Sequence, residues 1–240
     1  MNGTILVGLG GIRLQVVFLV FTGTSRAGRQ GQKDRVRDTE RQMTARIAPL
    51  NEPIQRFLDL FEKAKKEETH DATAVGLATS TMHGRPSLRM VLCKSADVRG
   101  FVFFTNYQGR KATELESNLQ AAMTFYWPGM YVQVRIEGTV DRVSAEESDA
   151  YFSARPEGHR LGAWSSDQSK EIDPAQTLEE KFEEVERRFT GQEIPRPPHW
   201  GGYRIAPESI EFWFGKENRM HEREQYLRAG NGWTVRRLQP

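Results

Sequence analysis

The succession of short apolar segments is the feature that most constrains the fold of this chain. Each segment is apolar or alternates apolar with polar side chains, and turn-forming residues bound it, so each predicts a β-strand. The segments lie at 74–80, 88–93, 101–105, 122–127 and 131–140, with further strands from Trp200 onward and a last hairpin at Asn231-Gly232. Because they lack a regular strand–helix alternation, they favour an antiparallel sheet over a doubly wound one.

Helices are predicted between some of these strands. Asn51 and Pro53 suit a helix start, and the apolar side chains that follow at helical spacing are Ile54, Phe57, Leu58 and Phe61. Two capping-box patterns, at 144–147 and 177–180, predict two more helices. The last helix has an apolar stripe that we interpret as core packing, formed by Leu178, Phe182, Val185 and Phe189. The predicted class is therefore α+β, mainly antiparallel β, as a barrel or sandwich with flanking helices.

The composition is that of an ordinary soluble domain and excludes several classes of function. With 34 basic and 32 acidic residues the net charge is +2, so no global field selects nucleic acid and any anion site must be local. The single cysteine, Cys93, excludes an internal disulfide and a thiolate metal cluster. This fits a reducing compartment, and we expect a cytoplasmic protein. The five histidines are too scattered for a paired ligand motif, so we predict no metal site.

Residues 1–42 differ from the rest of the chain. Arg13, Gln15 and several glycines interrupt their apolar stretches, so we expect no membrane-spanning helix there. The first eight residues have no charged side chain, unlike the start of a secretory signal. We interpret 1–42 as a disordered extension or a non-native start, with Met43 as the alternative beginning, and 43–240 as a single domain.

The segment 210–223, IEFWFGKENRMHER, spaces three nitrogen-rich side chains two residues apart. If it forms two short strands joined at 215–218, Arg219, His221 and Arg223 share one face of the second strand. Such a face, with Trp213 nearby, suits a flat, anionic, aromatic ligand. On spacing alone, a solvated edge strand whose charges prevent aggregation explains the pattern equally well.

Basic residues recur where the predicted elements begin or end. Arg110 and Lys111 lie where a strand passes into a helix, and a helix start offers unpaired N–H groups to a phosphate. Arg89 and Lys94 flank an apolar strand, and their spacing would place them on opposite faces. Arg155 follows the helix at 145–153. Each residue alone fits a solvated surface, whereas their recurrence indicates anion sites.

Several motifs follow one another along the chain. In order they are Arg89-Met-Val-Leu-Cys-Lys94, Phe104-Thr-Asn106 with Arg110-Lys111, Gln133-Val-Arg-Ile-Glu-Gly138, Tyr151-Phe-Ser-Ala-Arg155-Pro156, Leu161-Gly-Ala-Trp-Ser-Ser-Asp-Gln168-Ser169, Trp200-Gly-Gly202, Glu211-Phe-Trp213 and Arg219-Met-His221-Glu-Arg223. In order and approximate spacing they resemble the pyridoxine/pyridoxamine 5'-phosphate oxidase family, from roughly residue 51 to the carboxyl end. The resemblance implies an FMN-binding split β-barrel with a C-terminal dimerisation region. It also implies a homodimer with FMN at the subunit interface. The implied reaction of vitamin B6 metabolism oxidises pyridoxamine or pyridoxine 5'-phosphate to pyridoxal 5'-phosphate, with O2 as acceptor and H2O2 as product.

The resemblance also implies a role for each matching residue. FMN would be held by Arg89, Met90, Val91, Leu92, Phe104, Thr105, Arg110, Lys111, Gln133, Gln168, Ser169, Trp213 and Arg223. The substrate phosphate would be held by Lys94, Tyr151 and Arg155, with His159 beside them. Arg219 and His221 would close over the substrate ring as the catalytic pair, through positioning and charge stabilisation.

Three departures from the family pattern put the identity of the substrate in question. His159 stands where a serine usually helps bind the substrate phosphate, Phe214 stands in place of a glutamine, and no tyrosine precedes Tyr107. One alternative is a related flavin oxidase of the phenazine-pathway type that acts on another aromatic substrate. Another is a flavin or pyridoxal phosphate binding protein without turnover.

Overall fold

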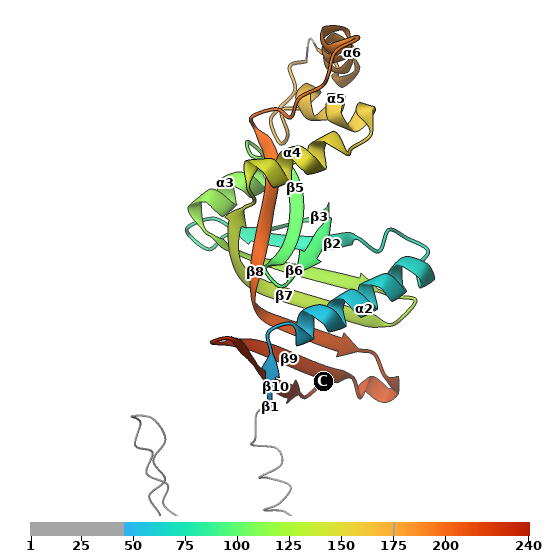
Figure 1. The fold of residues 1–240 in the computed structure, drawn as a ribbon, viewed down its shortest axis with the longest axis vertical. Helices are drawn as coiled ribbons and strands as arrows, with labels where there is room; N and C mark the ends of the chain where they lie inside the picture. The colour runs from blue at the N-terminus through green and yellow to red at the C-terminus, as the bar shows by residue number, and fades with distance from the viewer. Residues whose placement is uncertain (1–45, 175) are drawn as a thin grey trace, which may run out of the picture. The chain divides into compact units, whose positions relative to one another are not determined.

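The computed structural model describes residues 46–174 and 176–240; the predicted extension 1–42 lies outside them. In this part of the chain ten strands form one sheet in the order β1-β10-β9-β8-β7-β6-β2-β3, while β5 pairs with β8 and β4 with β5. Every pair is antiparallel. The α+β class with a mainly antiparallel sheet is therefore confirmed (Figure 1).

The elements follow the predicted order with two additional short strands and one additional helix. The strands are β1 (Arg46–Pro49), β2 (Ala74–Ser80), β3 (Pro86–Leu92), β4 (Ser95–Asp97), β5 (Gly100–Asn106), β6 (Gln120–Trp127), β7 (Val132–Arg142), β8 (Trp200–Phe214), β9 (Glu222–Ala229) and β10 (Gly232–Leu238). The α-helices are α2 (Glu52–Glu67), α3 (Arg110–Ser117), α4 (Ala145–Ser153), α5 (Glu157–Ser165) and α6 (Leu178–Phe189), and η1 (Glu217–Arg219) is a 3₁₀ turn. The sequence missed β1 and β4 because four and three residues are too few to show a period.

Strand β8 connects the two ends of the domain. Its first six residues pair with β5, its last six pair with β9, and β7 runs beside most of its length. A bulge between Glu137 and Gly138 shifts the β7–β8 register. Figure 1 shows β8 passing from helices α4–α6 at one end to β9 and β10 at the other.

Helix α2 covers the main core. Its Ile54, Phe57 and Phe61 are buried, and the Phe57 ring lies 4.8 Å from that of Phe101 and 5.0 Å from that of Phe125. The predicted apolar face is therefore correct for these three residues, while Leu58 is only partly buried. Because α2 spans the sheet, burial of these aromatic rings joins it to strands far apart in sequence.

Helices α4, α5 and α6 form a second, smaller core with the start of β8. Buried Phe152, Leu161 and Trp200 form its centre. The core prediction for the α6 stripe was wrong at Leu178, which is 58% exposed because it opens the helix, whereas the other three stripe residues pack partly buried. The sequence missed α5, whose short stretch includes Gly158 and Gly162.

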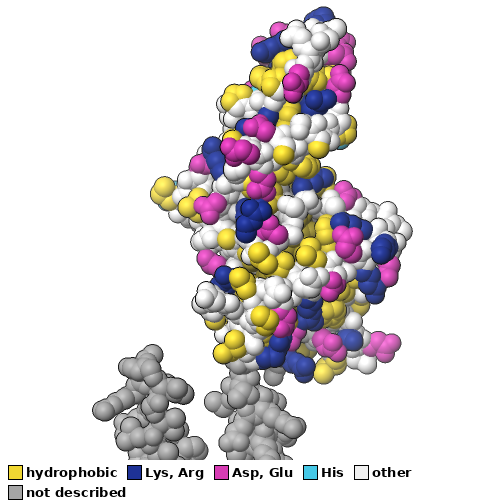
Figure 2. Space-filling model, viewed as in Figure 1, with side chains coloured by type: hydrophobic (Ala, Val, Ile, Leu, Met, Phe, Trp, Pro, Cys, Tyr) yellow, Lys and Arg dark blue, Asp and Glu magenta, His cyan; other side chains and the backbone are white. Residues whose placement is uncertain are grey.

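The described surface has mixed charge. Figure 2 shows basic and acidic side chains interspersed over the visible face. No helix among the described residues is long and apolar enough to cross a membrane.

Candidate functional site

A cavity of about 600 Å³ lies between β3, β5 and the helices α3, α4 and α5. The residues that line it are Met90, Val91, Leu92, Lys94, Phe104, Thr105, Asn106, Lys111, Tyr151, Arg155, Gly158, His159, Gly162, Ala163, Ser166, Gln168 and Trp200. These described residues include two lysines, an arginine and a histidine, but neither an aspartate nor a glutamate. The cavity therefore offers cationic donors without a carboxylate to neutralise them.

Lys111 is the most deeply buried of these cations. Only 8% of the residue is exposed, and its Nζ donates to Gln168 Oε1 at 2.7 Å and to Thr105 Oγ1 at 3.1 Å. Burial, and then the nearby charge of Arg89, lowers the pKa of Lys111. Within the described chain no carboxylate forms an ion pair with it. A buried cation without a counter-ion is costly, so the site favours an anionic ligand.

The start of α3 adds to this positive region. Gly109 caps the helix without a side-chain hydrogen bond, and the first turn contains Arg110 and Lys111 but no acidic residue. Cations at this end oppose the helix dipole, and the first N–H groups have no capping side chain. A phosphate would relieve both costs.

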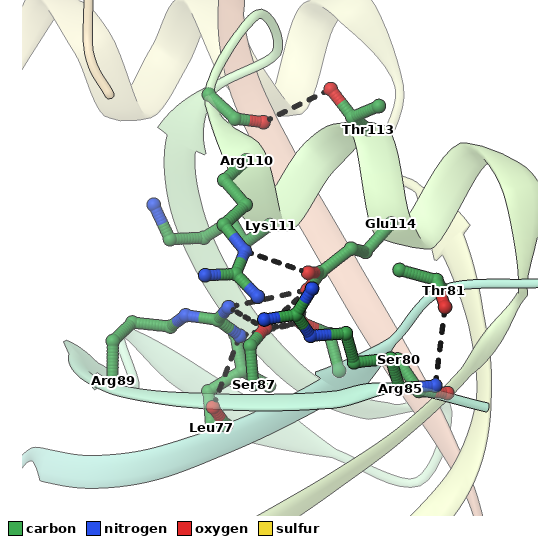
Figure 3. Close-up of polar contacts among 12 residues, drawn as sticks. Leu77, Ser80, Thr81, Arg85, Ser87, Arg89, Arg110, Lys111, Thr113 and Glu114 are labelled. Atoms are coloured by element: carbon green, nitrogen blue, oxygen red, sulfur yellow. Dashed lines mark hydrogen bonds and ion pairs between the residues drawn. The ribbon is translucent and has the colours of Figure 1, made fainter. Parts of the chain in front are cut away.

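Arg89 and Arg110 meet beside the cavity rather than on its lining. Arg89 comes from β3 and Arg110 from the first turn of α3, and both donate to the carboxylate of Glu114 (Figure 3). The structure thus brings together two of the basic residues that the sequence placed at the ends of separate elements.

The opposite side of the cavity contains a second cationic group. The guanidinium of Arg155 lies 4.7 Å from the Trp200 ring centroid, and its buried Nη1 has no hydrogen-bond partner among the described residues. Burial lowers the pKa of Arg155, against the opposing influence of Tyr151. The Tyr151 ring stacks on Phe104 at 3.9 Å. Lys94 and His159 are exposed and also line the cavity. Lys94 lies beyond the end of β3 at Leu92, so the alternation of a regular strand does not extend from Arg89 to Lys94.

Three of the predicted flavin residues form a row elsewhere on the sheet. Gln133, Trp213 and Arg223 are register partners across β7, β8 and β9. Arg223 Nε donates to Glu211 Oε1 at 2.8 Å, and this hydrogen bond raises the pKa of Arg223. None of the three lines the cavity described above.

The predicted common strand face of Arg219, His221 and Arg223 was wrong. Residues 217–219 form the 3₁₀ turn η1, Asn218 and Arg219 have φ of 54° and 61°, and β9 begins only at Glu222. Because the chain reverses between antiparallel β8 and β9, residues 215–221 form the turn and are not part of a strand. Arg219 is exposed in the turn, while the His221 ring lies 4.6 Å from that of Trp213.

Arg219 and His221 line a cavity of about 620 Å³. A neighbouring cavity of about 360 Å³ shares His221 and includes Arg223. The 620 Å³ cavity also contains Tyr131, which the sequence interpretation missed. Tyr131 has a positive φ of 54°, and its ring meets Trp213 edge-on at 5.3 Å. Its position after Pro128-Gly129, a turn signal, is the feature that could have indicated it.

The predicted residues thus fall into three groups in one subunit. Those on the 600 Å³ cavity are Met90, Val91, Leu92, Lys94, Phe104, Thr105, Lys111, Tyr151, Arg155, His159 and Gln168. Those at the C-terminal strands are Gln133, Trp213, Arg219, His221 and Arg223. The remaining three are Arg89 and Arg110, which meet at Glu114, and Ser169, which is exposed with φ of 69°.

Sequence comparison assigns the chain to a family. The family model "Pyridoxamine 5'-phosphate oxidase" matches residues 61–189, and "Pyridoxine 5'-phosphate oxidase C-terminal dimerisation region" matches 200–240. A pyridoxine/pyridoxamine 5'-phosphate oxidase from Rubrobacter xylanophilus is 53% identical over 79% of this chain and 87% of its own. The chain belongs to the pyridoxamine 5'-phosphate oxidase family. The oxidase of the same name from Anaeromyxobacter dehalogenans is 52% identical over 79% of this chain and 96% of its own.

Solved structures place the fold of this pyridoxamine 5'-phosphate oxidase family member among known relatives. PhzG from Burkholderia lata, solved with tetrahydrophenazine-1-carboxylic acid, matches with a TM-score of 0.74 and 32% identity over 78% of this chain and 92% of its own. A pyridoxamine 5'-phosphate oxidase-related, FMN binding protein from Nostoc punctiforme has the same fold, with a TM-score of 0.63, 18% identity, and coverage of 78% of this chain and 98% of its own. The predictions of the family, the split-barrel fold and an FMN-dependent oxidoreductase are confirmed.

Proposed function

We propose that this protein oxidises pyridoxine 5'-phosphate, or pyridoxamine 5'-phosphate with consumption of water and release of ammonia, to pyridoxal 5'-phosphate, with O2 as acceptor and H2O2 as product. The observation behind this proposal is the carboxylate-free cavity with separate cationic groups at Lys111 and Arg155. Two anionic groups, one on the cofactor and one on the substrate, match two such groups. The names of the relatives that match along most of their length support the same reaction.

The first group of residues fits FMN. Lys111, Arg110 and Arg89, with the uncapped start of α3, would hold its phosphate, and Thr105 and Gln168 would join through their contacts with Lys111. FMN, when bound, supplies the redox chemistry by accepting a hydride from the substrate carbon and passing the electrons to O2. The protein side chains bind, orient and shield the reacting groups.

The second group would hold the substrate phosphate. Arg155 and Lys94 supply charge, Tyr151 supplies a hydroxyl, and His159 supplies a ring nitrogen at the same cavity. The buried, unpartnered Nη1 of Arg155 is a donor that a phosphate oxygen could accept. The side chain of His159 is longer than the serine that the family usually has at this position, so its ring nitrogen would reach the phosphate from farther away.

The C-terminal residues would complete the site from the partner subunit. Gln133, Trp213 and Arg223 would contact FMN, and Arg219 and His221 would orient the substrate ring. The C-terminal match to a dimerisation region supports a homodimer. In this arrangement each FMN would lie at the subunit interface, between the 600 Å³ cavity of one subunit and the C-terminal strands of the other.

A phenazine-type substrate is the second candidate, because PhzG is 32% identical over 78% of the chain. That ligand has a carboxylate but no phosphate. The two cations Lys94 and Arg155 on the cavity favour the phosphorylated substrate, since a dianion uses more charged donors than a carboxylate does. A cytoplasmic location stays a prediction.

Anaerobic reduction of the flavin tests the proposed reaction. Protein loaded with FMN is mixed with pyridoxamine 5'-phosphate, with unphosphorylated pyridoxamine, or with tetrahydrophenazine-1-carboxylic acid, and the flavin absorption band is followed. We expect bleaching with pyridoxamine 5'-phosphate alone, and recovery in air with formation of pyridoxal 5'-phosphate. Arg155→Met should keep FMN but require at least about tenfold more substrate.

Two results would contradict this proposal. Bleaching by the phenazine compound but not by the phosphorylated vitamer would assign the second candidate function. Tight FMN binding without reduction by any vitamer would indicate a binding protein without turnover.

A further inference from the structure

Glu114 is a buried carboxylate at the centre of a polar cluster beside the 600 Å³ cavity. It lies on α3 and is 4% exposed. Oε1 accepts from Arg110 Nε at 2.9 Å, and Oε2 accepts from Arg89 Nη2 at 3.3 Å and from the hydroxyls of Thr79 and Ser87. Figure 3 shows Glu114 reaching from α3 toward β3, where Arg89 and Ser87 meet it.

Strand register explains why these groups converge. In the β2–β3 pair, Thr79 lies opposite Ser87 and Leu77 opposite Arg89. Arg89 Nη1 donates to Leu77 O at 3.2 Å and to Thr79 Oγ1 at 2.6 Å, and its Nη2 also donates to Ser87. The guanidinium of Arg89 is thus fixed against the sheet on one side and Glu114 on the other.

The orientation of Arg110 depends on Glu114 more than that of Arg89 does, because Arg89 also donates to residues of β2 and β3. Its side chain is 57% exposed, and its hydrogen bond to Glu114 uses Nε. Within the described chain its two terminal nitrogens have no hydrogen-bond partner, so they can donate to a bound ligand. The pair follows the i, i+4 spacing of a helix, but with the cation at the positive helix end. Without the carboxylate between them, the guanidinium groups of Arg89 and Arg110 would repel each other.

Glu114 is ionised under ordinary conditions. Burial acts to raise its pKa, but hydrogen bonds from Ser87, Thr79, Arg110 and Arg89 outweigh burial and lower the pKa to about 2. The cluster of two arginines and one carboxylate therefore keeps a net positive charge. It can hold an anion while its geometry stays fixed.

We infer that Glu114 is a positioning residue for the cofactor phosphate, because it holds Arg89 and Arg110 in the arrangement that binds this phosphate. The inference rests on the proposed function, which assigns both arginines to FMN. As an anion, Glu114 would repel the phosphate, so it would act through the two arginines rather than by direct contact. Glu114 would contribute by fixing the direction of the two guanidinium groups before the ligand binds. Binding then does not have to order these side chains, which reduces its entropy cost.

Binding of FMN and riboflavin to the apoprotein tests the inference, since the two ligands differ only in the phosphate. Affinities are measured by flavin fluorescence for wild type, Glu114→Gln, Glu114→Asp and Glu116→Gln. Glu116 is a matched control on the same helix, where it accepts hydrogen bonds from Arg142 and Tyr203 and contacts neither Arg89 nor Arg110.

We expect Glu114→Gln to weaken FMN binding at least about tenfold and riboflavin binding less than about twofold. Glu114→Asp keeps the charge and should lose less FMN affinity, and Glu116→Gln should match wild type. Equal losses for both ligands would indicate a purely structural role and overturn the inference. Tighter FMN binding by Glu114→Gln would also overturn it, because repulsion would then outweigh positioning.

Wild type provides the separate check on the proposed function. If wild type binds riboflavin as tightly as FMN, the phosphate assignment fails, and the inference fails with it. If Glu114→Gln does not fold, Ser87→Ala removes a donor to Glu114 and a partner of Arg89 with little change in volume. It should show a smaller loss that is still specific for FMN, and an unchanged ratio of the two affinities would overturn the inference.

Discussion

The buried charge of Lys111 destabilises the apoprotein but would stabilise a bound anion. It is buried without a carboxylate partner among the described residues, and its charged amine is stabilised by Thr105 and Gln168. Lys111→Met keeps a long unbranched side chain, one atom shorter, and removes the charge. FMN affinity should fall at least about tenfold. The free energy of unfolding of the apoprotein should change by less than about 1 kcal/mol, because the variant loses the two hydrogen bonds of Lys111 but no longer buries a charged amine.

Fluorescence titration with FMN and urea unfolding of the apoprotein measure these two quantities. Lys65→Met on α2 is the control, because Lys65 forms a surface pair with Glu62 far from α3 in sequence. Unchanged FMN affinity in Lys111→Met would remove this residue from the proposed phosphate site.

Glu114 should make the stability of the apoprotein depend on pH. Its pKa is lowered to about 2 in the folded state from an ordinary value of 4.5, which corresponds to a stabilisation on the order of 3 kcal/mol. Because the folded pKa is the lower one, this stabilisation is complete above pH 4.5 and is lost as the pH falls from about 4.5 toward 2. The difference in free energy of unfolding between wild type and Glu114→Gln should therefore shrink below about pH 4.5. Urea unfolding between about pH 6 and pH 3 checks this, and a difference independent of pH would contradict it.

Among the structural elements, the β7–β8 pair depends on one glycine. A Cβ on Gly138 would lie 2.0 Å from the carbonyl oxygen of Ala206, and the backbone there cannot move away without breaking the register. Gly138→Ala should lower the free energy of unfolding by about 3 kcal/mol. Gly76→Ala, also in a strand, is the control: its nearest neighbour would be 3.7 Å away, so its stability should change by less than about 1 kcal/mol. Urea unfolding of both variants measures the effect, and equal stabilities would contradict it.

Elements with a periodic side-chain pattern could be predicted from the sequence. Apolar Val132, Val134 and Ile136, which alternate with polar residues, identified β7, and an apolar stripe with a proline start identified α2. The turn after β8 was not predictable in this way. Arg219 and His221 lie where the chain reverses, and their positions depend on φ angles that no side-chain period encodes.

The site residues show the same division. Basic residues at the ends of elements indicated an anion site, and the structure brings Arg89 and Arg110 together through Glu114. Glu114 itself was missed, because in sequence nothing distinguishes it from Glu116, the other acid on α3. Only the pairing of β2 with β3 and the packing of α3 bury it.

At the scale of the whole molecule, the predicted FMN residues lie at separate places within one subunit. Lys111 lines the 600 Å³ cavity, whereas Arg223 lies on β9 and lines a different cavity. Figure 1 shows β9 at the opposite end of β8 from helices α4–α6. If one FMN uses both residues, we expect them to come from different subunits of a dimer with two-fold symmetry.

Mixed dimers test this arrangement directly. Lys111→Met and Arg223→Ala homodimers should each bind FMN weakly, because every site lacks one contact. After the two proteins are unfolded together and refolded, half of the dimers should be mixed, and each mixed dimer has one site with both residues intact. Tight FMN binding should then return to about a quarter of all sites. A protein with both substitutions in the same chain is the control. Refolded with an equal amount of wild type, its mixed dimers have no site free of substitution, so tight binding should be confined to the wild-type homodimers, about a quarter of all sites, rather than the half expected if one subunit supplied both residues. Failure of the two single variants to restore any tight site would mean that Lys111 and Arg223 do not serve one FMN across the interface.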